Sequence, residues 1–174
     1  MIELPLFLKL RSTLSVALIF VIFSGSAQCP DSFVFFSQAA LNEFALNYPN
    51  CTAANIVVLK HPNTGWSIFD TDIEDLSPLS NIQSFQSIII NGNPLLTNLE
   101  GLNGLTMQGI GQIRIENNTN LEDISALGNI IGQVGLLHIE NNQSLMSLTG
   151  LHNVISTTNE VTIRKNPGLA SLQV

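Results

Sequence analysis

A repeat of about two dozen residues constrains this chain more than any other feature. Four similar segments follow one another in the second half of the 174-residue sequence, and each carries an asparagine at an equivalent position. These asparagines, Asn93, Asn118, Asn142 and Asn166, are separated by 25, 24 and 24 residues. Leu96, Leu121, Leu145 and Leu169 keep the same spacing, as do Leu99, Ile124, Leu148 and Leu172. So many columns in register predict structurally equivalent units that stack on one another.

Each repeat combines two periodicities. Before the asparagine, aliphatic residues alternate, as at Ile113 and Ile115, which is typical of a short strand with two inward side chains. After the asparagine the period becomes three, as at Leu121, Ile124 and Leu127, which suits short extended or 3₁₀-like sides. The pattern predicts a mainly β fold, a solenoid of parallel strands about 4.8 Å apart with a shared aliphatic core.

The asparagines are expected to form a ladder at one corner of the solenoid. Their amides can bond the turn backbone, which would otherwise be buried without partners. An earlier, degenerate repeat contains Ile73, Leu76, Leu79 and Ile82, with Asp70 in place of the asparagine. Small residues precede an inward leucine in three repeats, at Gly101, Ala126 and Gly150, and are expected to let the chain bend there.

Residues 1–27 are typical of a secretory signal peptide. Lys9 and Arg11 are followed by an apolar run over residues 14–23, and residues 25–27 are small. This order of basic, apolar and small residues predicts cleavage after Ala27. The alternative is an N-terminal membrane anchor, which would need about 20 apolar residues.

Residues 28–53 are predicted to form an N-terminal cap for the solenoid of residues 54–174, which would have about five coils. A strand is expected at Phe33–Phe36, and Ser37 is a suitable N-cap for a helix whose apolar face contains Leu41, Phe44, Ala45 and Tyr48. Cys29 and Cys51 are expected to form one disulfide, because an exported chain matures in an oxidising compartment. Trp66, in an insertion over residues 61–67, could pack on the cap or form an exposed contact.

The charge balance excludes some classes of partner. The chain has 13 acidic and 6 basic residues, and removal of residues 1–27 takes away Glu3, Lys9 and Arg11, which leaves 12 and 4. Nucleic acids and anionic membrane surfaces select for Lys and Arg, so neither is an expected partner. No transmembrane segment is expected after signal cleavage, and the chain is predicted to be secreted or displayed at the cell surface.

The cap and the coils together resemble a known family. Cys29–Thr52 contains CP…SQAALNEFALNYPNCT, DIEDLSPLSNI follows at Asp72–Ile82, and LxxLxxL coils come next. This arrangement, over roughly residues 29–174, is similar to receptor L-domain leucine-rich repeats, and most of all to their bacterial secreted versions. The resemblance implies a right-handed β-helix-like solenoid and a role in recognition or adhesion. Bacterial members often carry a C-terminal sorting domain, which this sequence does not contain.

The outward residues of the predicted strands are the candidate binding face for a protein or glycan. One column contains Ile89, Arg114, His138 and Thr162, and the next contains Asn91, Glu116, Glu140 and Arg164. Glu116 and Glu140 should lie on adjacent strands, where like charges repel and favour a nearby cation. A salt bridge from Arg164 to Glu140 is a better interpretation than a metal site. The alternative for the whole face is a solvated surface without a partner.

Other candidate chemistry in the sequence is weak. Asp70, Asp72, Glu74 and Asp75 form an acidic cluster that could hold calcium or act in a glycosidase, but acids are also common in solvated turns. His138 has no nucleophile in its repeat, and no hydrolase, zinc-protease or nucleotide-binding motif is present. We therefore expect no catalytic residues, no metal and no cofactor.

Three functions remain open at the level of sequence. The first is a recognition or adhesion module, the second a passive spacer in a longer surface protein, and the third, remote, a carbohydrate-active β-helix enzyme. The sequence stops at Val174 within a repeat. Because an uncovered coil exposes apolar side chains and backbone, further C-terminal sequence or a partner is expected to cover this end.

Overall fold

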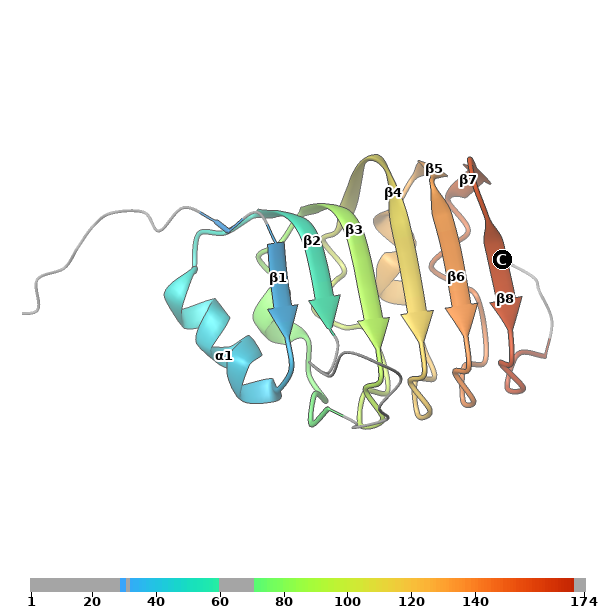
Figure 1. Cartoon of the computed structure of the whole chain (residues 1–174), viewed down its shortest axis with the longest axis horizontal. Helices are drawn as coiled ribbons and strands as arrows, with labels where there is room; N and C mark the ends of the chain where they lie inside the picture. Colours follow the sequence, from blue (N-terminus) through green and yellow to red (C-terminus); the bar gives the residue numbers. More distant parts are fainter. Residues whose placement is uncertain (1–28, 31, 60–70, 171–174) are drawn as a thin grey trace, which may run out of the picture.

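Six parallel strands form one sheet that runs the length of the molecule. The computed structural model describes residues 29–30, 32–59 and 71–170, with only the backbone described at 54–59 and 108–110. The sheet order is β1-β2-β3-β4-β6-β8, and neighbouring strands lie side by side in Figure 1. The strands are β1 (Ser32–Phe35), β2 (Ala53–Leu59), β3 (Ser84–Asn91), β4 (Thr106–Glu116), β6 (Leu136–Glu140) and β8 (Val161–Arg164). The expected signal peptide, Trp66 and Asp70 lie outside the described residues.

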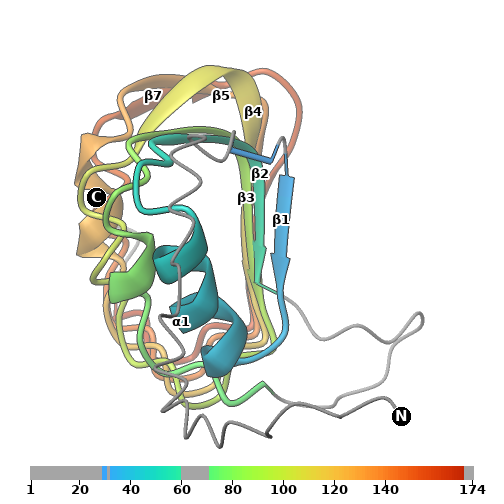
Figure 2. The ribbon, with the colours of Figure 1, turned by 90° about the vertical axis from the view of Figure 1, so that its left-hand side faces the viewer.

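The chain winds from strand to strand as a β-solenoid. About three regular turns carry it from β3 to β4, β6 and β8, and the view along the stack in Figure 2 shows the coils superposed. The predicted 3₁₀-like sides are present as η1 (Ser77–Leu79) and η2 (Ser125–Asn129). A second, two-stranded parallel sheet, β5 (Gly132–Val134) with β7 (Val154–Thr157), was not predicted.

Equivalent aliphatic side chains share one interior, as the repeat predicted. Two inward columns are in register across the sheet, Ile88–Ile113–Leu137–Val161 and Ile90–Ile115–Ile139–Ile163. The leucines after the corner, Leu96, Leu121 and Leu145, are fully buried beneath them. Val161 differs from the prediction, because its side chain is 52% exposed. It lies on the last described strand of the sheet, where no further described coil packs against it.

A strand and a helix cover the first coil, at the left of Figure 1. Helix α1 (Gln38–Asn47) begins after Ser37, whose Oγ accepts a hydrogen bond from the Ala40 backbone at 3.3 Å, which confirms the predicted N-cap. Phe33 and Phe44 pack edge to face with ring centroids 4.4 Å apart. The predicted Cys29–Cys51 disulfide is present, with Cα atoms 5.3 Å apart. Aromatic burial and the disulfide therefore close this end of the core.

The asparagine ladder is present and continuous. Asn118 Oδ1 accepts hydrogen bonds from the backbone N–H and from Nδ2 of Asn93, at 3.0 and 3.1 Å, and Asn118 Nδ2 donates to the Ile90 carbonyl at 3.0 Å. Asn142 and Asn166 repeat this geometry one coil further each. All four asparagines are buried. The ladder therefore satisfies polar groups that water does not reach.

Thr71 contributes the first contact of the ladder within the described residues. Its hydroxyl donates a hydrogen bond to Asn93 Oδ1 at 2.6 Å. The same hydroxyl accepts from the Ile73 backbone at 3.3 Å. A threonine can do this because one hydroxyl both donates and accepts.

Two glycines are required at tight approaches between coils. Gly101 and Gly150 have φ angles of +101° and +110°, and a Cβ at either would overlap the backbone carbonyl of the preceding coil, at Leu76 and at Ile124. This close approach explains the small residues predicted there. Among the described residues, no helix is long and apolar enough to cross a membrane.

Candidate functional site

The outward side chains of the sheet are aligned as the repeat predicted. Arg114, His138 and Thr162 are direct neighbours across β4, β6 and β8, and Ile89 of β3 precedes them. The second column, Asn91, Glu116, Glu140 and Arg164, is also in register. Because alternate residues of a strand point to opposite faces, the inward isoleucines fix these polar side chains outward.

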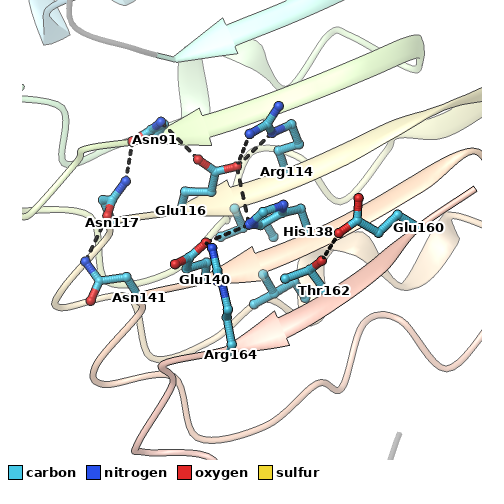
Figure 3. Close-up of polar contacts among 12 residues, drawn as sticks. Asn91, Arg114, Glu116, Asn117, His138, Glu140, Asn141, Glu160, Thr162 and Arg164 are labelled. Carbon is cyan, nitrogen blue, oxygen red and sulfur yellow. Dashed lines mark hydrogen bonds and ion pairs between the residues drawn. The ribbon is translucent and has the colours of Figure 1, made fainter. Parts of the chain in front are cut away.

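The centre of this face is a histidine between two glutamates. His138 Nε2 lies 2.9 Å from Glu140 Oε2 and 3.9 Å from Glu116 Oε1 (Figure 3). The side chains are only 12% (Glu116), 16% (His138) and 16% (Glu140) exposed. Contact with neighbouring strands therefore fixes the position of each group more firmly than is usual for exposed charges.

Basic side chains surround the two glutamates. Arg114 Nη2 lies 2.7 Å from Glu116 Oε1, and Glu140 is contacted by Arg164 at 2.8 Å and by Lys165 at 3.0 Å. The predicted salt bridge between Arg164 and Glu140 is thus present, whereas Lys165 was not anticipated. Hydrogen bonds from His138 and Arg164 lower the pKa of Glu140 to about 2. Glu140 therefore remains ionised at neutral pH.

A second row of asparagines, which the sequence did not lead us to expect, borders the cluster. Asn117 Nδ2 donates to Asn91 Oδ1 at 3.0 Å, and Asn141 Nδ2 donates to Asn117 Oδ1 at 2.8 Å (Figure 3). Asn117 and Asn141 both have φ +58°, a conformation that asparagine adopts more readily than most residues. The repeated Asn-Asn pairs at 117–118 and 141–142 were the available signal.

The two ends of the first column differ from its centre. Ile89 is half-buried and apolar, and the Thr162 hydroxyl donates to Glu160 Oε1 at 2.6 Å. The first column thus changes from an apolar side chain at Ile89 to polar side chains with hydrogen-bond partners on β4, β6 and β8. Such a face can contact a large ligand at several points.

The acidic cluster of the first coil has a structural role in the described part of the chain. Asp72 Oδ1 accepts from the Gln38 backbone N–H at 2.9 Å, which ties the turn to the start of α1. Asp75 accepts from the backbone and hydroxyl of Ser77, at 2.8 and 2.7 Å. No group of three or more His, Cys, Asp or Glu side chains among the described residues could hold a metal ion. These contacts favour the turn interpretation over calcium.

The outward face of the sheet thus carries a group of polar side chains that hold one another in position. Its central groups come from three adjacent strands: Arg114 contacts Glu116 on β4, and Glu140 contacts His138 on β6 and Arg164 on β8, all at hydrogen-bond distance. The two groups of side chains approach each other at 3.9 Å, between His138 and Glu116. Comparisons with protein-family models, with curated proteins and with solved structures find no match for this chain.

Proposed function

We propose that this chain is a recognition or adhesion module of the leucine-rich repeat type, similar to receptor L-domains, which binds a protein or glycan through the outward face of its sheet. We further propose a right-handed winding and a secreted or cell-surface location. The disulfide supports that location, because such bonds persist in oxidising compartments.

One observation carries the proposal. The polar groups of the face hold one another in place, since His138, Glu140 and Arg164 are joined by contacts of 2.9 and 2.8 Å. A ligand that meets fixed donors and acceptors loses less free energy to the ordering of side chains. The strands beneath are stiffened by the buried ladder, so the spacing between contact points is also fixed.

The alternative is a passive spacer, for which the same network would only stabilise the sheet. A labelled wild-type protein, incubated with arrays of glycans and of extracellular protein domains, separates the two functions. The double variant Arg114→Ala/His138→Ala removes the centre of the face, whereas His152→Ala removes an exposed histidine outside the outward columns.

We expect the wild type and His152→Ala to bind the same array members, and the double variant to lose at least tenfold in affinity. Equal binding by the double variant would exclude the sheet face as the binding surface. Absence of binding by the wild type on both arrays would favour the spacer.

A further inference from the structure

Among the described residues, the sheet ends at β8. The Leu137 and Asn141 backbone N–H groups donate to the carbonyls of Glu160 and Arg164, at 2.9 and 3.2 Å, so even-numbered residues of β8 direct their backbone groups to β6. The backbone N–H and C=O groups of Val161 and Ile163 therefore point away from β6. In the described residues no strand pairs with that side of β8, at the right of Figure 1.

An apolar hollow of about 270 Å³ lies behind this edge. Val161 and Ile163 line it together with Leu137, Leu148, Leu151 and Val154. Free backbone groups beside exposed apolar side chains are the two features that another strand-bearing surface would cover. A partner that offers both a strand and an apolar face would therefore fit this surface.

We propose that a second copy of this chain is that partner, with the two β8 strands paired antiparallel about a two-fold axis through Thr162. In this register Val161 of each copy lies opposite Ile163 of the other, and the two residues exchange both of their backbone hydrogen bonds. Their side chains meet on the inner side, where the two apolar hollows face each other. A two-fold interface of this kind is closed, so association stops at the dimer.

The charged residues beside Thr162 favour this register of the two β8 strands. On the outer side of β8, Glu160 and Arg164 lie at equal distances on either side of Thr162, so Glu160 of each copy lies opposite Arg164 of the other. Such pairs occupy the closely spaced, non-hydrogen-bonded positions, where Cα atoms are about 4.5 Å apart. A shift of the axis to Val161 or to Ile163 places threonine opposite a charged residue and loses both ion pairs. The edge is thus self-complementary in backbone, apolar contact and charge.

Analytical ultracentrifugation of the purified protein over a range of concentrations tests the association. We expect a monomer–dimer equilibrium for the wild type. Glu160→Lys places two lysines opposite two arginines and should weaken the dimer by roughly tenfold or more. Glu122→Lys makes the same change in charge at an exposed side chain away from β8 and should leave the dimer unchanged. A wild type that stays monomeric, or a dimer insensitive to Glu160→Lys, would overturn the proposal.

A single cysteine tests the register directly. Thr162→Cys places two thiols opposite each other on the two-fold axis, within the Cα separation that a disulfide requires. Because Cys29 and Cys51 are already bonded to each other, mild oxidation should yield a reducible covalent dimer. Ile155→Cys, at a more exposed position on β7, should cross-link far more slowly. Equal cross-linking of the two variants would refute pairing through β8. Neither measurement depends on the ligand of the sheet face.

Discussion

Replacement of Asn118 by alanine is the most direct test of the ladder. The side chain is fully buried and makes hydrogen bonds to Asn93 and Ile90 in the preceding coil and to Asn142 in the following coil. Its removal leaves the backbone N–H and the side-chain N–H of Asn93 without their acceptor. At about 1–3 kcal/mol for each buried donor left unsatisfied, the expected loss of unfolding free energy is about 4 kcal/mol. That is a large part of the 5–15 kcal/mol roughly typical of a domain.

Urea unfolding followed by far-UV circular dichroism measures this loss. The matched control is Asn120→Ala, two residues further along the same coil, where an exposed amide donates only to the Pro94 carbonyl at 2.8 Å. We expect that control to cost under about 1 kcal/mol. If Asn118→Ala were no more destabilising than Asn120→Ala, the ladder would not be a main source of stability and the reasoning would be refuted.

Three further predictions concern other parts of the fold. Gly150→Ala should lower the free energy of unfolding by about 3 kcal/mol or more, because the new Cβ would overlap the Ile124 carbonyl. Gly132→Ala, at a glycine with φ +101° and open space around it, should cost only about 1–2 kcal/mol in urea unfolding. Equal losses in the two variants would show that the close approach to Ile124 is not the cause. The folded-state pKa of Glu140 is depressed from 4.5 to about 2, so its contribution to stability is present above pH 4.5 and is lost as the pH falls toward 2. Glu140→Gln should therefore show a smaller fall in Tm over that range than the wild type, and parallel Tm profiles would contradict this. Cys29→Ala/Cys51→Ala should lower the free energy of unfolding by about 3 kcal/mol, because the bond constrains a separation of 22 residues in the unfolded chain; an unchanged urea midpoint would show that the cap is held by its aromatic packing alone.

The repeat allowed the coil geometry to be predicted because each column is a purely local pattern copied several times. The inward isoleucines, the buried leucines, the asparagine corner and the outward columns all follow from spacing alone. The contact between Arg164 and Glu140 was also predictable, because register places those residues on adjacent strands.

Features that depend on side-chain conformation and on contacts between coils could not be predicted from the spacing of residues. The position of His138 between two glutamates depends on rotamers, and so does the hydrogen bond from the Thr71 hydroxyl to Asn93. The short strands β5 and β7 lacked any alternating pattern long enough to identify. Val161 was expected to be buried like the equivalent residues of the other coils. Its burial depends on a further coil packed against it, which the spacing of residues within the repeat cannot predict.

The hydrogen bonds to the amide oxygens of the asparagine ladder all run in the same direction along the solenoid, which bears on how the repeat could be extended. Each amide oxygen in the series from Asn93 to Asn166 accepts from the preceding winding, so every junction uses the same donor–acceptor arrangement. A tandem duplication of residues 118–141 would recreate that junction on both sides of the inserted unit. Such a gene could lengthen by whole units without a new core having to evolve, and the spacings of 25 and 24 residues show that the unit can vary by one residue while the amide contacts are kept.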